Sequence, residues 1–315
     1  MKILVIGGSY FLGRAFVEAA SRIDEVTLIN RGNRPIKGTD KKVNGIPLSK
    51  EQLDNILEIV TDRHDEQALR ALPHEKFDVV VDFCGYSADD IRLFVENSCS
   101  SFDQYIFVST SDVYRRGTGA FLDENAEYET RDFGGDAGLY IIGKVAAEKE
   151  LKKLSEGKFH YTIVRPAFIY GPGNYAPREG IYFNWIDKAG QIIHPTDATG
   201  YFQMVYVKDL AWGILKLCGN EKAFDEEVNI CDSEKITYDG FAQILRQATG
   251  VSFEQVGMTV SEIDEKGIPL PFPLTAEESE YYVNAKSEGL GIEYTDIVKG
   301  MHETYISWED EKDAL

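Results

Sequence analysis

The sequence predicts an α/β fold in which a doubly wound parallel sheet is interleaved with a smaller C-terminal substrate lobe. Short apolar runs, such as residues 2–6 and 105–108, have the character of strands that are buried on both faces. Longer segments with room for a helix separate these runs, and this alternation is typical of a parallel sheet with helices on both sides. Ligands of such sheets bind at the carboxyl ends of the strands, so functional residues are expected in the turns that follow them.

A glycine-rich turn follows the first predicted strand and leads into a helix expected over residues 11–22. The free N–H groups and the positive end of that helix suit a pyrophosphate. Glycines in the turn allow close approaches that a Cβ would obstruct. The turn is therefore the predicted dinucleotide cradle, with an ordinary strand-to-helix connection as the alternative. Its residues are Gly7, Gly8, Ser9, Tyr10, Phe11, Leu12 and Gly13.

The end of the second predicted strand, residues 25–29, bears on the choice of cofactor. Asn30 and Arg31 follow the strand directly, and Arg34 comes three residues later. A carboxylate at this point would bind the ribose hydroxyl of NAD, whereas an arginine accommodates the additional phosphate of NADP. We therefore expect NADP, with NAD as the alternative. The other interpretation of Arg31 and Arg34 is that they are solvated loop cations.

Tyr140 and Lys144 are the predicted acid–base pair. They lie one turn apart on one face of a helix expected over residues 136–154. A phenol with a pKa of about 10 is a poor base at neutral pH, and a cation one turn away favours its ionised form. Tyr282 and Lys286 have the same spacing, but they lie in a late acidic stretch outside the strand–helix alternation. We expect a structural role for that second pair.

Hydroxyl side chains directly follow the strand predicted at residues 105–108. Ser109, Thr110 and Ser111 come first, and Asp112 follows them. A hydroxyl at this strand end can hydrogen-bond the substrate oxygen that exchanges its proton with a neighbouring tyrosine. The strand end and the Tyr140 helix are therefore expected to form one reaction site.

Taken in order, these motifs resemble the extended branch of the short-chain dehydrogenase/reductase superfamily, which includes nucleotide-sugar epimerases and dehydratases. Residues 165–173 are similar to the segment that passes the nicotinamide into the substrate lobe, and residues 205–211 to a later strand and helix start. The similarity covers nearly the whole chain. It implies a Rossmann-type fold, hydride transfer, and the catalytic set Thr110, Tyr140 and Lys144.

The resemblance also implies cofactor contacts beyond the glycine turn. Asp62, which follows a strand near residues 57–60, resembles an aspartate that contacts adenine, and Arg63 beside it either stacks on the base or is a surface charge. A fourth strand, residues 77–83, ends where the branch runs its backbone past the cofactor ribose. The remaining expected cofactor residues are Cys84, Gly85, Ser109, Pro166 and Phe168.

Three residues are expected on the substrate side. Tyr86 follows the fourth strand. The alternative to a substrate contact is that Tyr86 is simply a buried aromatic at the strand end. Tyr175 and Arg178 lie on the loop that enters the substrate lobe. Arg178 is a candidate for binding a substrate phosphate, and an exposed loop cation is its alternative interpretation.

The chain departs from the branch at two positions. Tyr10 stands where most extended members have the middle glycine, so its side chain must point away from the pyrophosphate or cover it. In having a large residue at this position, the chain resembles a subgroup that includes reductases, epimerase-like enzymes and chloroplast stem-loop RNA-binding proteins. Ser111 replaces the acid that sugar 4,6-dehydratases carry directly after the catalytic threonine. An epimerase, decarboxylase or carbonyl reductase is therefore expected rather than a dehydratase.

Composition narrows the functional classes further. The 315 residues carry a net charge of −20, which argues against broad binding to a phosphate backbone. The four cysteines have no paired metal spacing and the five histidines form no cluster, so no metal site is expected. No run approaches membrane-spanning length and no signal-peptide pattern opens the chain. We expect reduced thiols and a cytoplasmic location.

The sequence predicts an NAD(P)-binding domain over residues 1–165, with returning elements near 201–230, and a substrate lobe mainly over 166–315. The expected activity is epimerase- or reductase-type hydride transfer on a nucleotide sugar, without nucleic-acid or membrane partners; a homodimer is a family expectation. Two alternatives remain. The first is a non-catalytic NADP-binding regulatory or redox-sensor protein, which the Tyr140/Lys144 pair disfavours. The second is an RNA-binding relative, which the acidic charge disfavours.

Overall fold

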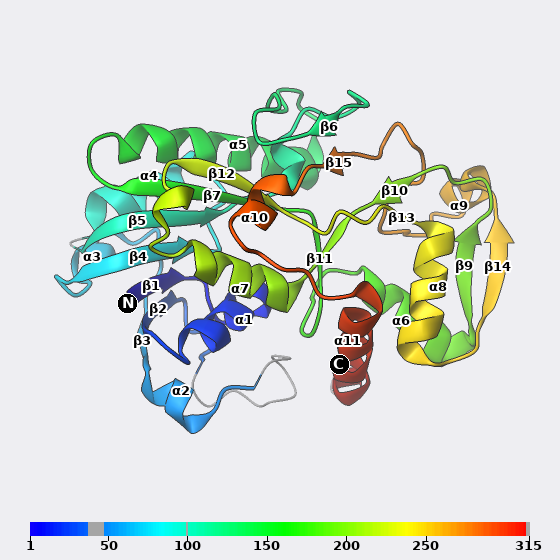
Figure 1. Cartoon of the computed structure of the whole chain (residues 1–315), viewed down its shortest axis with the longest axis horizontal. Helices are drawn as coiled ribbons and strands as arrows, with labels where there is room; N and C mark the ends of the chain where they lie inside the picture. Colours follow the sequence, from blue (N-terminus) through cyan, green and yellow to red (C-terminus); the bar gives the residue numbers. More distant parts are fainter. Residues whose placement is uncertain (37–46, 99, 313–315) are drawn as a thin grey trace.

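The computed structural model describes residues 1–36, 47–98 and 100–312. A parallel sheet of seven strands in the order β12-β7-β5-β4-β1-β2-β3 forms its centre (Figure 1). The predicted α/β class with a doubly wound parallel sheet is confirmed. The strands are β1 (Lys2–Ile6), β2 (Glu25–Asn30), β3 (Ile56–Val60), β4 (Lys76–Asp82), β5 (Ser101–Val108), β7 (His160–Pro166) and β12 (Glu226–Ile230).

Helices cover both faces of this sheet. In Figure 1, α4 and α5 lie along one face and α1 and α7 along the other. The helix that carries Tyr140 runs from Gly135 to Ser155, close to its predicted span. The helices are α1 (Phe11–Ala20), α2 (Lys50–Asp54), α3 (Glu66–Arg70), α4 (Ala88–Asn97), α5 (Gly135–Ser155), α6 (Glu179–Ala189), α7 (Val207–Leu217), α8 (Tyr238–Thr249), α9 (Val260–Glu265), α10 (Ala285–Gly289) and α11 (Ile297–Glu311).

The second lobe is built from short strand pairs and the later helices. Of the elements expected to return near residues 201–230, β12 pairs with β7 and α7 packs on α1. The strands at residues 201–206, by contrast, lie outside the main sheet, because each pairs with a short strand of the second lobe. The pairs are β6 (Phe121–Leu122) with β15 (Tyr281–Tyr282), β8 (Phe168–Tyr170) with β11 (Met204–Tyr206), β9 (Gln191–Pro195) with β14 (Glu254–Met258), and β10 (Tyr201–Phe202) with β13 (Ile236–Thr237).

Two apolar clusters hold the sheet between its helices. Alternate residues of β1 point to opposite faces, so Ile3 and Val5 join one cluster while Leu4 and Ile6 join the other. The cluster under α1 and α7 continues without interruption into the second lobe, as far as Met301 of α11. The two lobes therefore share one hydrophobic core.

Candidate cofactor and reaction site

A cavity of about 1080 Å³ lies at the carboxyl ends of the sheet strands, where the fold class places ligands. Of the predicted site residues, Gly8 and Gly85 are the two that do not line it. Those that do are Gly7, Ser9, Tyr10, Phe11, Leu12, Gly13, Asn30, Arg31, Arg34, Asp62, Arg63, Cys84, Tyr86, Ser109, Thr110, Tyr140, Lys144, Pro166, Phe168, Tyr175 and Arg178.

The glycine turn brings backbone rather than side chains to the cavity. Gly7 has a φ of +84°, and a Cβ on it would lie 2.7 Å from the sulfur of Cys84. A Cβ on Gly13 would lie 2.6 Å from the carbonyl oxygen of Gly7, so only glycine lets α1 approach the turn this closely. Gly8 packs beneath the cavity, where a Cβ would meet Val5 and Val17. The turn therefore leaves the start of α1 open to a ligand.

Tyr10 joins three segments at the wall of the cavity. The guanidinium carbon of Arg34 lies 3.7 Å from the centroid of the Tyr10 ring, a cation–π contact. The ring also stacks on Tyr175, with centroids 5.3 Å apart, while Phe11 meets Tyr175 edge-on at 5.9 Å. Tyr10, which replaces the middle glycine of the motif, thus connects the loop after β2 with the loop before α6.

The loop after β2 is held by Asn30 and Glu58. The amide of Asn30 donates to the Glu58 carboxylate at 2.6 Å, and its oxygen accepts from the Gly32 N–H at 2.6 Å. Glu58 also accepts from the Ile36 N–H at 2.8 Å. Asn30 is therefore engaged in shaping the loop, whereas Arg31 is exposed on the cavity wall.

Arg63 is not a surface charge, so that alternative is wrong. Its side chain is buried, and its two terminal nitrogens each donate to one carboxylate oxygen of Asp82 at 2.9 Å. Burial opposes ionisation of Asp82, but Arg63 outweighs this effect and holds the pKa of Asp82 below its ordinary value. Asp62, by contrast, is exposed at the cavity and accepts from the His64 N–H at 2.9 Å.

The segment after β4 places Tyr86 beside the reaction residues. Burial raises the pKa of the Cys84 thiol to about 11, so this thiol stays protonated at neutral pH. Tyr86 is 52% exposed, which contradicts the alternative of a buried aromatic. Its N–H donates to Asp90 at 2.8 Å, and its ring lies 6.3 Å from that of Tyr140.

The predicted catalytic residues converge in the structure. Thr110 lies two residues after the end of β5 and hydrogen-bonds with Tyr140 on α5. Lys144, one turn further along α5, is 2% exposed and donates to the carbonyl oxygens of Gly85 at 2.7 Å and Val108 at 2.8 Å. These bonds explain why Gly85 lies behind the cavity wall.

The electrostatics differ from the expectation based on spacing alone. Burial, and then the charge of Asp112, raises the pKa of Tyr140, whereas the hydrogen bond with Thr110 lowers it. The net shift is upward, so burial outweighs any lowering of the Tyr140 pKa that the nearby charge of Lys144 provides. Burial also lowers the pKa of Lys144 to about 8. Tyr140 is thus a proton donor at neutral pH.

Ser109 and Arg165 belong to a buried network behind the reaction residues. The Ser109 hydroxyl donates to the Glu148 carboxylate at 2.5 Å, so its proton is already engaged. Arg165 donates to the same carboxylate through Nε at 3.1 Å and Nη2 at 2.6 Å. It also donates to the hydroxyls of Tyr114 and Tyr128, each at 3.0 Å. This network fixes the end of β5 against α5 and β7.

Arg178 is likewise more than an exposed loop cation. It is half-buried, donates to the carbonyl oxygen of Ile169 at 3.0 Å, and lies 5.1 Å from the centroid of the Phe168 ring. Asn174 and Glu179 hold the loop in front of it through hydrogen bonds of 2.9 and 3.1 Å. The loop therefore presents Tyr175 and Arg178 to the cavity from a fixed base.

Tyr282 is a cavity residue that the sequence did not predict. It hydrogen-bonds with Ser111, next to the reaction residues. Its spacing from Lys286 is accidental, because Lys286 instead pairs with Glu226 at 2.7 Å. Tyr282 follows Ser111 by 171 positions in the sequence, so no local pattern could have revealed its place in the cavity.

Gly143, which was not among the predicted site residues, allows α5 to approach Tyr86. A Cβ on Gly143 would collide with the carbonyl oxygen of Tyr86. We expect Gly143→Ala to destabilise the protein by about 1–3 kcal/mol in urea unfolding, because the added methyl has no space. Gly180→Ala on α6 is the matched control, since nothing lies near its Cβ, and it should be neutral or stabilising by up to about 1 kcal/mol. Equal stability of the two variants would contradict the close approach.

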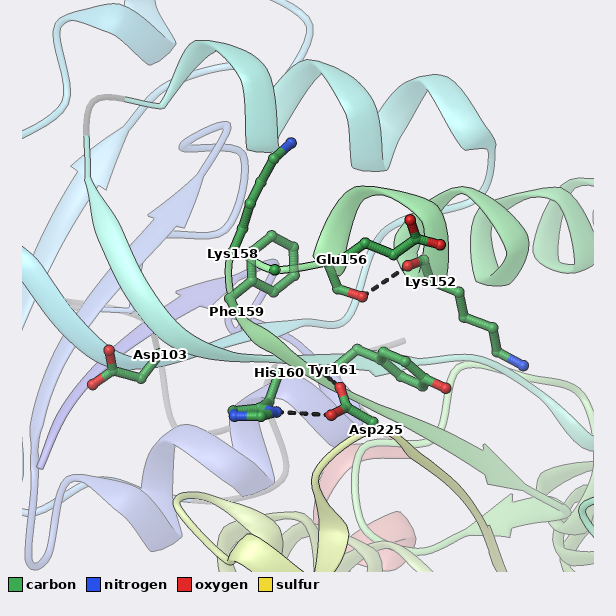
Figure 2. A pocket seen from close by; sticks show the side chains of 10 residues that line it. Asp103, Lys152, Glu156, Lys158, Phe159, His160, Tyr161 and Asp225 are labelled. Carbon is green, nitrogen blue, oxygen red and sulfur yellow. Dashed lines mark hydrogen bonds and ion pairs between the residues drawn. The ribbon is translucent and has the colours of Figure 1, made fainter.

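A second cavity, of about 790 Å³, lies at the opposite edge of the sheet (Figure 2). His160 and Asp225 face each other there, with 2.8 Å between Nδ1 and the carboxylate. It contains none of the predicted site residues.

Within residues 1–36, 47–98 and 100–312, no group of three or more His, Cys, Asp or Glu side chains is placed to hold a metal ion. None of the helices described there is long and apolar enough to cross a membrane.

Comparisons with known proteins agree with this architecture. The chain is 30% identical to the chloroplast stem-loop binding protein of 41 kDa b of Arabidopsis thaliana, over 96% of this chain and 78% of that protein. Its fold matches UDP-glucose 4-epimerase of Thermotoga maritima with a TM-score of 0.75, at 19% identity and over the full length of both chains. UDP-glucuronic acid 4-epimerase of Bacillus cereus, solved with UDP-glucuronic acid and NAD, matches with a TM-score of 0.70, at 17% identity and over both full lengths.

The sequence profile of the NAD dependent epimerase/dehydratase family matches residues 3–231, which include the glycine turn, the hydroxyl cluster and the Tyr140/Lys144 helix. This match spans more than two thirds of the chain. It confirms the resemblance on which the motif assignments were based. The chain therefore belongs to the NAD-dependent epimerase/dehydratase family.

Proposed function

We propose that the protein catalyses NAD(P)-dependent hydride transfer at a carbinol or carbonyl carbon of a nucleotide sugar, as an epimerase or reductase. The observation that carries this proposal is the convergence of Thr110, Tyr140 and Lys144 at the carboxyl edge of the sheet. The same cavity contains the glycine turn, whose shape and open helix start fit a dinucleotide. A nicotinamide cofactor bound there would supply the hydride acceptor or donor.

The three side chains have complementary roles in this proposal. Tyr140 exchanges a proton with the substrate oxygen, for which its raised pKa suits the donor direction. Thr110 already hydrogen-bonds with Tyr140 and orients the same oxygen. Lys144, fixed by two carbonyl oxygens, has one remaining N–H for the cofactor ribose. Its positive charge favours ionisation of Tyr140 when the reaction runs in the oxidative direction.

NADP is the proposed cofactor because Arg31 is exposed at the cavity, whereas no carboxylate ends β2. Isothermal titration calorimetry with NADPH and NADH tests this. We expect Arg31→Ala to weaken NADPH binding by about 10-fold or more, the effect of one charged hydrogen bond, and to leave NADH binding unchanged. Arg22→Ala is the control and should alter neither affinity, because Arg22 is an exposed residue just after α1 that pairs with Glu18. A preference for NADH in the unaltered protein would overturn the NADP assignment, and binding of neither would overturn the enzymatic proposal.

RNA binding is the second candidate, because the Arabidopsis relative is named a stem-loop binding protein. The charge opposes it, since 53 acidic residues outnumber 33 lysines and arginines. Fluorescence anisotropy with a stem-loop RNA at physiological salt separates the two candidates, and we expect no binding. The homodimer, the two domain ranges and the cytoplasmic location remain predictions from the sequence.

A further inference from the structure

The reaction end of the cavity carries one carboxylate, Asp112, close to the proposed catalytic residues. It lines the cavity together with Ser111 and Tyr282. The Thr110 hydroxyl lies 3.3 Å from one Asp112 oxygen. After burial, the charge of Asp112 is the largest influence that raises the pKa of both Tyr140 and Tyr282. A group bound against Tyr140 therefore lies near the carboxylate of Asp112.

The cations described near this end have partners, although a carbonyl oxygen leaves the charge of its cation uncompensated. Lys144 is bonded to two carbonyl oxygens, and Arg178 to one. Arg116 forms an ion pair with the other oxygen of Asp112 and is not among the residues that line the cavity. Glu280 adds further negative charge, which raises the pKa of Tyr282. The described part of the chain thus presents hydroxyls and one acid to the reacting group.

Tyr282 is held rigidly in this wall. Gln203, itself buried, accepts from the N–H of Tyr282 at 2.7 Å and donates to its carbonyl oxygen at 3.1 Å. The ring stacks on Tyr114, with centroids 5.9 Å apart, and the hydroxyl bonds with Ser111. A side chain fixed at backbone, ring and hydroxyl cannot retreat from a bulky or charged substituent, so it limits what the pocket accepts.

We propose that Asp112 and Tyr282 are specificity-determining residues, which select a sugar whose reacting ring carries neutral hydroxyl groups and reject one that carries a carboxylate. This inference rests on the proposed function, because it concerns the substrate of the same site. A sugar hydroxyl can donate to Asp112, whereas a carboxylate at that position would be repelled by it. Asp112 thus contributes to specificity in two ways, because it accepts a hydrogen bond from a hydroxyl and repels a carboxylate.

Calorimetric titration of the cofactor-loaded protein with UDP-glucose and UDP-glucuronate tests the inference, since the two sugars differ only in a hydroxymethyl or carboxylate group at C6. We expect UDP-glucose to bind at least about tenfold more tightly. Asp112→Asn should lower the ratio of the affinities for UDP-glucose and UDP-glucuronate at least about threefold, because it improves UDP-glucuronate binding. Glu127→Gln is the control and should leave the ratio unchanged, because Glu127 forms an exposed ion pair with Arg115 outside the cavity.

Tyr282→Phe provides a second, independent measurement. The ring and its packing remain, but the hydroxyl at the cavity wall is lost, so UDP-glucose binding should weaken while UDP-glucuronate binding does not improve. Equal binding of the two sugars to the unaltered protein, or an unchanged ratio in Asp112→Asn, would overturn the inference and leave the proposed function intact. Binding of neither sugar, despite a bound cofactor, would overturn the nucleotide-sugar function and the inference together.

Discussion

Tyr140→Phe is expected to lower turnover by about 10²- to 10⁴-fold, the usual contribution of a positioned proton donor. Phenylalanine keeps the ring that packs near Tyr86, so the wall of the cavity is preserved. The hydroxyl that bonds with Thr110 is lost, and with it the proton that the substrate oxygen exchanges. Steady-state kinetics with the sugar accepted by the unaltered protein provide the measurement. The affinity for NADPH, measured by calorimetry, should change by less than about twofold.

The control for this prediction is Tyr294→Phe. Tyr294 is also a partly buried tyrosine with a bonded hydroxyl, which lies 2.7 Å from Ser287, but it is not among the residues that line the cavity. Its replacement should leave turnover unchanged. A fully active Tyr140→Phe variant would refute the catalytic assignment, whereas equal losses of activity and cofactor affinity would indicate a structural effect.

Arg165→Met is expected to destabilise the protein by about 3–5 kcal/mol, because it leaves the buried carboxylate of Glu148 without its partner. Arg165 and Glu148 are both buried, and the pair joins β7 to α5. Methionine fills part of the volume but supplies none of the hydrogen bonds to Glu148, Tyr114 or Tyr128. The free energy of unfolding in urea provides the measurement.

Two further variants separate loss of the pair from loss of packing. Arg115→Ala removes an exposed ion pair with Glu127 and should cost no more than about 1 kcal/mol. In the double variant Arg165→Met/Glu148→Leu the uncompensated charge is gone, so much of the stability should return. If Arg165→Met alone costs less than about 1 kcal/mol, the network does not hold the strand end in place.

The sequence predicted what is encoded locally. A buried apolar run, a glycine turn and a helix are contiguous in residues 2–22, and Tyr140 and Lys144 share one helix face. Each of these patterns depends on neighbouring residues, so spacing and residue type were sufficient. The same holds for the parallel direction of the strands, because alternating helices leave few other connections.

Interactions between distant segments escaped prediction. Arg63 looked like a cofactor contact or a surface charge because Asp82, which binds it, lies on another strand. Asn30 was assigned to the cofactor although Glu58 engages its amide. Tyr282 reaches the cavity only because Gln203 and the second lobe hold it there. In each case the partner is set by tertiary packing, which residue spacing does not report.

The uninterrupted core limits how this molecule can move. Side chains from β1 to α11 form one packed cluster, and a hinge between the lobes would have to break it. The Tyr175 ring, by contrast, is 66% exposed and contacts Tyr10 across the cavity wall. Rotation of exposed side chains takes picoseconds to nanoseconds and loop motion up to microseconds, far faster than domain rearrangement. The Tyr10–Tyr175 contact is therefore a part of the cavity wall that can rearrange without breaking the shared core.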